Sequence, residues 1–396
     1  MGRGSSSGAE KCDVLVAGGG PAGLFLAVLL AQQGVDVVVL ERRNVPSTHS
    51  RAIGLHPPAL AALRSVGLDE AVSARGVAIQ RGVGRSRGRH LGELTFERIH
   101  PEFPFVLALP QHCTEALLAA RLEELAPGAV RRGWDVVDAH DGTGRVHVTA
   151  RHAAATEGNA RWRARVLVGA DGPHSLVRTR SGIDVHRKLY PDTYLMGDYA
   201  DTTSDGTTAV IHLEPGGVVE SFPSPGGVRR WVAHTGSTPA EPNPADLAAI
   251  IRSRTGEVLS PRSNTMISAF TVRRQLTRRM VTGRRVLIGD AAHEISPIGG
   301  QGMTLGWLDA QALAPLLQQL LAHDPGDPLP ALPCFRDFER ARLRSARTAA
   351  RHAELNMAVG RPAPAPVRQA RDVALRTILG TPVRHRLART FTMGWA

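Results

Sequence analysis

Residues 12–23 read CDVLVAGGGPAG, an apolar run typical of a buried strand that leads directly into a G-x-G-x-x-G pattern. Apolar residues over 24–31 predict a helix after it, and residues 35–40 predict a second strand. In such a unit Gly18 permits a tight turn, Gly20 lets backbone approach a pyrophosphate, and Gly23 lets helix and strand pack closely. The free amides and the positive dipole end of the helix then face the phosphates. The stretch therefore predicts a dinucleotide site.

An acidic residue closes the second strand at the distance such a site requires. Glu41 lies 23 residues after Gly18, where a carboxylate can accept hydrogen bonds from the adenosine ribose hydroxyls. A glycine pattern by itself often marks only a turn. Here the strand, helix, second strand and acid follow in order, which favours nucleotide binding.

A second motif lies about 270 residues later, where residues 285–302 read RVLIGDAAHEISPIGGQG. The predicted strand ends at Gly289 and Asp290, and a carboxylate there can accept hydrogen bonds from a polyol chain such as ribityl. The loop from Pro297 to Gly302 opens a helix whose amides can stabilise negative charge at the N1–C2=O edge of a reduced isoalloxazine. The alternative is an ordinary helix-start loop. Paired with the first motif, the second predicts FAD rather than NAD.

A third motif indicates a ligand site at the same edge of the predicted sheet. Residues 166–175 read VLVGADGPHS, a strand that delivers Asp171 and Gly172 before a predicted helix. Ligands bind outside the carboxyl ends of strands in open α/β sheets. A plain Asp-Gly turn is an equally good interpretation of this motif taken alone.

Length and composition describe a globular protein. The 396 residues suit two joined domains, with 42% hydrophobic and 21% charged residues. The polar leader over 1–11 has no signal-peptide core, and the apolar runs are too short to span a bilayer. The three cysteines are far apart, with neither a C-x-x-C pair nor a disulfide framework. We therefore expect a cytoplasmic protein with no membrane span.

A net charge of +12 raises the question of nucleic-acid binding. Nearly all of the basic residues are arginines, and they are scattered along the chain. Aromatic residues make up only 4%, which leaves few platforms for stacking bases, and no nucleic-acid module is recognisable. We expect no nucleic-acid partner; a weak preference for anionic ligands stays open.

Over the rest of the chain, apolar and polar residues first alternate, and the pattern then becomes helical. Residues 77–108 look β-rich, and alternation dominates from about 185 to 276, which makes that segment the candidate substrate-covering sheet. From 303 onward the pattern is helical. The first of these helices, over 303–321, has a predicted apolar face at Leu305, Leu308, Ala312, Leu316 and Leu320.

From about residue 13 to 319 the chain resembles the group A flavoprotein monooxygenases, typified by para-hydroxybenzoate hydroxylase and the aromatic-polyketide hydroxylases. The resemblance implies an α/β fold, with a Rossmann-like FAD-binding domain interleaved with a β-sheet substrate domain and followed by a helical C-terminal tail. We expect a flexible leader over 1–11 and a discontinuous FAD domain over 12–76, 102–184 and 277–330. The substrate domain then comprises 77–101 and 185–276, and the helical segment covers 331–396.

The resemblance also implies which residues hold the cofactor. It places the adenosine half of FAD on Gly18, Gly20, Ala22, Gly23, Glu41 and Arg42. It places the pyrophosphate and ribityl region on Arg51 and Gln111, and the ribityl chain on Asp290. Asp171 and Gly172 match the family motif that is associated with both FAD and NAD(P)H. The flavin-facing loop and the start of its helix comprise Pro297, Gly299, Gly300, Gln301, Gly302 and Met303, with Pro297, Gly299 and Gly300 as the catalytic segment. Thr304 stands where the family usually has asparagine, so the chain departs from the family pattern at one flavin-edge contact.

The implied reaction is reduction of FAD by NADPH or NADH, followed by oxygen transfer from O₂ through a flavin C4a-hydroperoxide to an aromatic or polyketide-like small molecule. Hydroxylation in secondary metabolism, such as antibiotic biosynthesis, is the leading interpretation. Baeyer–Villiger oxygenation, epoxidation and isoprenoid reduction on the same fold are the alternatives. A non-catalytic FAD-binding protein is the least favoured alternative. No metal ligand set is expected. The histidines His56, His212, His234 and His293 are interpreted as structural, so no protein acid or base is assigned, and the oligomeric state stays open.

Overall fold

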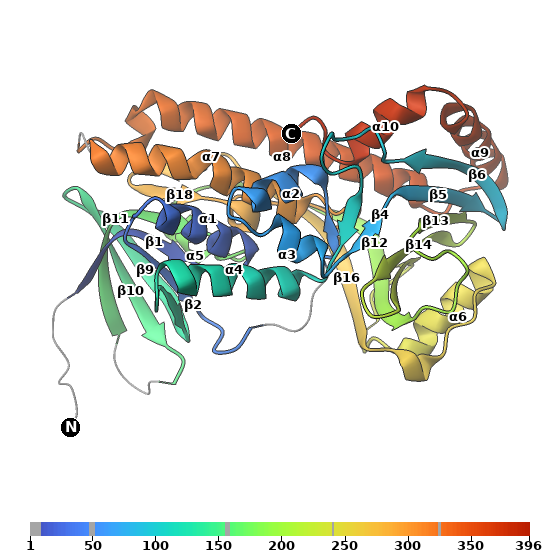
Figure 1. The fold of residues 1–396 in the computed structure, drawn as a ribbon, viewed down its shortest axis with the longest axis horizontal. Coiled ribbons are helices and arrows are strands. Elements are labelled where there is room, and N and C mark those ends of the chain that lie inside the picture. The colour runs from blue at the N-terminus through green and yellow to red at the C-terminus, as the bar shows by residue number, and fades with distance from the viewer. Residues whose placement is uncertain (1–8, 47–51, 155–158, 240, 324–325) are drawn as a thin grey trace.

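The computed structural model describes residues 9–46, 52–154, 159–239, 241–323 and 326–396. Two large β-sheets lie at opposite ends of the molecule, and helices cover the first sheet and bridge to the second (Figure 1). The predicted fold class, a mixed α/β protein with a helical C-terminal tail, is confirmed. Of the expected leader, residues 1–8 lie outside the described residues, while Glu10 and Lys11 already belong to the first strand.

The first sheet has the strand order β17-β18-β11-β1-β2-β8, in which the strands from β18 to β8 are parallel and β17 is antiparallel to β18, and β10 and β9 extend it from β11. Its strands are β1 (Glu10–Ala17), β2 (Val37–Glu41), β8 (Val130–Arg132), β9 (Trp134–Gly142), β10 (Arg145–His152), β11 (Asn159–Gly169), β17 (Val281–Thr282) and β18 (Arg285–Leu287). All five residues of β2 are buried, because a central parallel strand is covered on both faces. The glycine pattern, the Asp-Gly motif and the Gly-Asp motif therefore follow the adjacent strands β1, β11 and β18 at one sheet edge.

Helices cover this sheet and start at the same edge. α1 (Pro21–Gln32) packs against α4 (Gln111–Leu125) and α7 (Gly302–Ala322), and α5 (Leu176–Arg180) follows β11. The short helix η2 (Gly289–Ala291) and strand β19 (His293–Glu294) connect β18 to the loop before α7. The predicted apolar face of α7 was right only in part: Leu305 and Leu320 are buried, but Ala312 is exposed, and the buried stripe also includes Asp309, Leu313 and Leu317. The helix packs on α1 and α8 through a face that the leucine spacing identified only in part.

The second sheet has the order β19-β16-β12-β15-β14-β13-β5-β6. Its remaining strands are β5 (Arg81–Ser86), β6 (Arg89–Thr95), β12 (Val185–Ala200), β13 (Ala209–Glu214), β14 (Gly217–Ser224), β15 (Val228–Thr235) and β16 (Met266–Thr277). One face packs on α6 (Pro244–Thr255), where Trp231 and Tyr199 meet Leu247 and Ile251 in a buried cluster. Side chains of the other face, among them Val218 and Val232, line a cavity.

Short elements join the two sheets. β3 (Gly54–Leu55), β7 (Val106–Ala108) and β4 (Val77–Ile79) form a three-stranded sheet, flanked by α2 (Pro57–Arg64) and α3 (Asp69–Ser73). The 3-10 turns η1 (Pro261–Ser263) and η3 (Leu329–Ala331) complete the connections.

The C-terminal segment is helical. The long helix α8 (Pro333–Gly360) runs beside α7 and reaches from the first sheet to the second (Figure 1). α9 (Ala365–Leu379) and α10 (Val383–Phe391) then pack over β6. No helix within the described ranges combines the length and apolar character needed to cross a bilayer.

Candidate active site

A cavity of about 1310 Å³ lies between the two sheets. At one end it is lined by the loops that follow β1, β2, β11 and β18, and at the other by the inward face of the second sheet and by α8, α9 and α10. The segment 296–300 lies between these two regions and also lines the cavity. The space is therefore continuous from the predicted dinucleotide site to the candidate substrate sheet.

The glycine turn is required by close backbone packing. Gly18 has φ +106°, and a Cβ atom there would lie 2.3 Å from the carbonyl oxygen of Ala170. A Cβ on Gly23 would lie 2.0 Å from the carbonyl oxygen of Gly18, so Gly23 allows α1 to start against the turn. Gly20 caps α1 without a side-chain hydrogen bond, and a Cβ there would meet nothing within 4 Å. Gly20 thus leaves open space in front of the first amides of the helix, as an anionic phosphate requires.

Glu41 and Arg42 lie beside this turn and line the cavity. The Glu41 carboxylate accepts hydrogen bonds from the amide of Gly19 at 2.7 Å and from Nε of Arg43 at 2.8 Å. Burial opposes its ionisation, but these hydrogen bonds lower the pKa of Glu41 below its usual value. Glu41 therefore stays an acceptor beside the turn, and the exposed side chain of Arg42 faces the same space.

Asp171 caps the helix that follows β11. Its Oδ2 accepts hydrogen bonds from the amides of Leu176 at 2.7 Å and Val177 at 3.1 Å. Burial raises the pKa of Asp171, while hydrogen bonds that include one from Ser175 oppose the rise. Its Oδ1 is buried and has no hydrogen-bond partner among the described residues, so it is available to a donor on a bound ligand. Gly172, with φ +81°, lines the cavity next to it.

Gly289 and Asp290 sit where α1, η2 and α7 meet. Gly289 has φ +58°, and a Cβ on Gly306 of α7 would lie 3.2 Å from its Cα atom. This packing directs the side chain of Asp290 into the cavity, where it is open to the cavity space although protein surrounds it. Burial raises the pKa of Asp290 to about 6. An acceptor enclosed in this way fits the hydroxyls of a polyol chain.

A buried ionic cluster that the sequence did not reveal supports this turn. Asp309 of α7, which is fully buried, accepts hydrogen bonds from the amide of Gly289 at 3.0 Å, from Nε2 of His293 at 2.6 Å and from Nε of Arg342 at 2.7 Å. Burial opposes the charge on His293, but the Asp309 carboxylate raises the pKa of that imidazole. In the sequence, the available signal for this cluster was a single acidic residue among the apolar residues of the helix. Asp309 fixes the backbone that carries Asp290.

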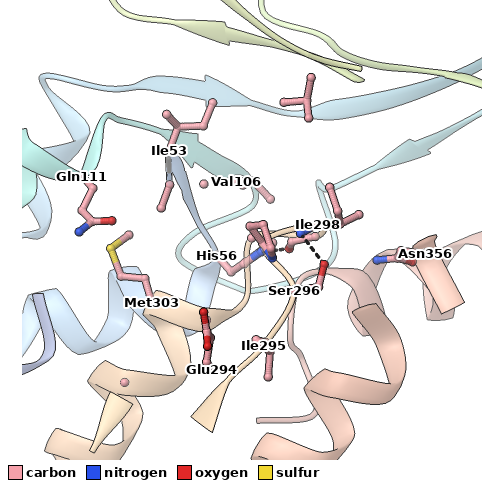
Figure 2. A pocket seen from close by; sticks show the side chains of 18 of the residues that line it. Ile53, His56, Val106, Gln111, Glu294, Ile295, Ser296, Ile298, Met303 and Asn356 are labelled. Atoms are coloured by element: carbon pink, nitrogen blue, oxygen red, sulfur yellow. Dashed lines mark hydrogen bonds between the residues drawn. The ribbon is translucent and has the colours of Figure 1, made fainter. Parts of the chain in front are cut away.

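The loop before α7 is held by a histidine. Nε2 of His56 lies 3.0 Å from the carbonyl oxygen of Gly299, and burial lowers the pKa of His56 to about 4. The imidazole is therefore neutral at pH 7 and donates to the loop. Gly299 and Gly300 have φ values of +96° and +66°, a conformation that favours glycine. Figure 2 shows His56 beside Ile298 and Ser296 of this loop.

The remaining predicted residues divide into three groups. Gln111 of α4 and Met303 of α7 line the cavity and point toward one another (Figure 2); the Gln111 side chain donates to Glu115 at 2.7 Å. Gln301 is buried and does not line the cavity, because its side-chain amide donates to the carbonyl of Phe391 at 3.3 Å. Its part is to hold the loop rather than to contact a ligand through its side chain. Arg51 lies outside the described residues.

The far end of the cavity is mostly apolar. The inward face of the second sheet and the adjoining elements contribute aliphatic and aromatic side chains: Ile79, Leu91, Leu94, Phe96, Val106, Ile211, Leu213, Val218, Phe222, Val232 and Phe270. The C-terminal helices add Asn356, Val359, Leu375 and Leu379, among others. Such a lining suits a flat hydrophobic molecule.

The family model described as FAD binding domain matches residues 11–329. The chain belongs to the family of group A FAD-dependent monooxygenases. It is 35% identical over 318 residues to 6-methylpretetramide 4-monooxygenase of Streptomyces rimosus, covering 77% of this chain and 55% of that protein. It is 31% identical to 6-hydroxy-3-succinoylpyridine 3-monooxygenase HspB of Pseudomonas putida, covering 79% and 81%. This chain thus spans little more than half of the Streptomyces relative.

A solved structure shares the fold over nearly the whole chain. p-Nitrophenol 4-monooxygenase PnpA of Pseudomonas putida DLL-E4 superposes with a TM-score of 0.84, covering 98% of both chains at 23% sequence identity. At this identity the likeness concerns the fold alone.

The cofactor of this monooxygenase family is FAD, and the residues present fit it. The open space at Gly20 lies in front of the free amides of α1, and the partnerless Oδ1 of Asp171 and the carboxylate of Asp290 face the same cavity. These groups offer donors to phosphates and acceptors to hydroxyls, as the two halves of FAD require.

Proposed function

We propose that this protein is an FAD-dependent, NAD(P)H-consuming monooxygenase that inserts one oxygen atom from O₂ into an aromatic or polyketide-like small molecule. The observation that carries the proposal is the continuity of the cavity. It runs from the dinucleotide turn, past the loop at Gly299 and Gly300, to an apolar chamber that suits an aromatic ring. The names of the relatives agree with this reaction class.

The cofactor and the chain have separate tasks. When bound, FAD supplies electron transfer from NAD(P)H and the activation of O₂. We assign the hold on its adenosine half to Gly18, Gly20, Ala22, Glu41 and Arg42. We assign the middle of the cofactor to Gln111, Asp171 and Asp290, and the ring to the loop from Pro297 to Met303.

The loop and α7 serve the ring electrostatically. α7 begins at Gly302 after Gln301, which makes no side-chain cap hydrogen bond, so its first amides are available to negative charge. The neutral imidazole of His56 holds the Gly299 carbonyl by donating to it. That contact fixes the orientation of the Gly299 carbonyl within the loop. Apolar residues of the chamber exclude water from the reacting atoms.

Hydroxylation in secondary metabolism is the favoured form of the reaction. Baeyer–Villiger oxygenation and epoxidation use the same cavity and cofactor, so the product distinguishes them. Isoprenoid reduction is the alternative that requires no oxygen transfer, and a non-catalytic FAD-binding role is a further alternative. We also place the protein in the cytoplasm, since Cys12, Cys113 and Cys334 are unpaired.

Cofactor release and substrate-gated oxidation test the proposal together. The purified protein should be yellow, and acid denaturation should release FAD that chromatography identifies. NADPH and NADH oxidation should be slow alone and accelerated by the correct aromatic compound, because ligand binding shifts the site toward its reducible state. A colourless protein that cannot be reconstituted with FAD would contradict the proposal.

A further inference from the structure

Glu220 is an isolated carboxylate on the floor of the apolar chamber. It lies on β14 between Ile211 of β13 and Val232 of β15, its partners in register. Val218 and Phe222, two residues away on either side, share its face of the strand. All five side chains line the cavity, so Glu220 is surrounded by hydrocarbon within the sheet.

The described residues provide no hydrogen bond and no counter-charge to this carboxylate. Burial alone raises the pKa of Glu220 to about 7. An ionisable group in an apolar site costs stability unless it is paired, so an unpaired one at a ligand-binding surface points to a ligand that pairs with it.

The nearby polar groups do not neutralise Glu220. Arg230, on the same face of β15, makes a bidentate ion pair with Asp198, with Nε and Nη2 each 2.7 Å from the carboxylate oxygens. Burial and the charge of Glu220 raise the pKa of Tyr194, so that phenol stays neutral. Arg386 of α10 lines the cavity with an exposed, solvated side chain. On the face of the sheet that lines the cavity, Glu220 therefore offers an acceptor to a ligand, and the cation Arg230 is already paired with Asp198.

Resting on the proposed function, we propose that Glu220 is a specificity-determining residue that accepts a hydrogen bond from a phenolic hydroxyl of the substrate and rejects aromatic acids. A hydroxyl donor satisfies the buried acceptor, whereas a ligand without a donor leaves it unpaired. A ligand carboxylate placed beside it adds a second negative charge in an apolar site, which disfavours binding further. The substrate class is thus a neutral, hydroxylated aromatic, in spite of the basic composition of the chain.

Three ligands with one ring system test this inference in the FAD-loaded protein. 2-Naphthol carries the donor, 2-methoxynaphthalene lacks it, and 6-hydroxy-2-naphthoic acid adds a carboxylate. Isothermal titration calorimetry at pH 8.5, where most of Glu220 is ionised, should give wild-type dissociation constants at least tenfold lower for 2-naphthol than for either other ligand. In E220Q, the acid should bind at least tenfold more tightly than in wild type, while 2-naphthol changes by only a few fold. In E220L, 2-methoxynaphthalene should bind at least as tightly as 2-naphthol.

The exposed Glu241 provides an isosteric control outside the cavity, and E241Q should keep the wild-type order of affinities. Wild-type protein that binds the acid as tightly as 2-naphthol would overturn the inference. A uniform change for all three ligands in E220Q would also overturn it, because a packing role alone predicts that pattern. Product analysis with a panel of phenolic and polyketide-like compounds is separate: a discriminating Glu220 without oxygenation of any compound in the panel refutes the proposed function only, and oxygenation without discrimination refutes only the role of Glu220.

Discussion

Replacement of Asp309 by asparagine should destabilise the protein, because it removes the charge that pairs with two buried cations. Asp309 and His293 are fully buried, and the Arg342 side chain is only 11% exposed. His293 can release its proton in the variant, but the guanidinium of Arg342 stays charged. Leaving one partner of a buried ion pair uncompensated costs about 3–5 kcal/mol. The asparagine oxygen retains one acceptor position, so we expect a loss near the lower end, about 3 kcal/mol.

The expected loss of unfolding free energy corresponds to a measurable change in the melting temperature. With an unfolding entropy of about 2.1 cal/mol/K per residue, a chain of 396 residues changes its melting temperature by roughly 1.2 °C per kcal/mol. The D309N variant should therefore melt about 4 °C below wild type in scanning calorimetry of the FAD-free protein. It should also bind FAD more weakly, because the amide of Gly289 loses a charged acceptor.

The matched control is D337N on α8. Asp337 is 72% exposed and lies 3.5 Å from Arg340, and an exposed pair of this kind contributes about 0–1 kcal/mol. D337N should melt within about 1 °C of wild type. If D309N also melts within 1 °C of wild type, the buried cluster does not support the Gly289 turn and the reasoning is refuted.

Three further predictions concern the cofactor end of the cavity. D290A should weaken FAD binding roughly five- to a hundredfold with the fold retained, since ribityl hydroxyls lose an acceptor; an unchanged dissociation constant would make Asp290 a turn residue only. The pKa of His56 is about 4 in the folded protein, so between about pH 4 and 6.5 the unfolded chain binds a proton at His56 that the folded protein does not bind. The free energy of unfolding should therefore fall by about 3 kcal/mol as the pH drops through that window, and H56Q should show a smaller fall; parallel pH profiles for the two proteins would contradict this. G23A should fail to fold or lose FAD binding, because its Cβ would lie 2.0 Å from the Gly18 carbonyl oxygen, and a G236A control is expected to fold because a Cβ at Gly236 meets nothing within 4 Å and the backbone there is not left-handed. Circular dichroism and FAD titration of the two variants check that contrast.

Most of what the sequence predicted about the dinucleotide end of the cavity came from local sequence patterns. The order of strand, glycine turn, helix, strand and acid depends on backbone geometry within about 30 residues, so the stretch around Gly18 and Glu41 is informative by itself. The Gly289–Asp290 turn was found for the same reason. Parallel strands bring such turns to one sheet edge, which is why motifs that are far apart in the chain line one cavity.

What the sequence missed depends on packing between distant segments. Asp309 and Arg342 meet only because α7 lies against α8, and the spacing of leucines predicted only part of the buried face of α7. Gln301 is polar and belongs to the loop motif, but its side chain turns to the carbonyl of Phe391 at the end of α10. Glu220 belongs to an alternating strand, and alternation does not say which of the two faces borders the cavity.

Isotope incorporation tests the central claim most directly. The FAD-loaded enzyme is incubated with NADPH or NADH, ¹⁸O₂ and a panel of phenolic and polyketide-like compounds, and the products are examined by mass spectrometry. A monooxygenase incorporates one ¹⁸O atom into the organic product and releases the other as water. A product that is reduced and contains no ¹⁸O would contradict the account and identify the protein as a reductase on the same fold.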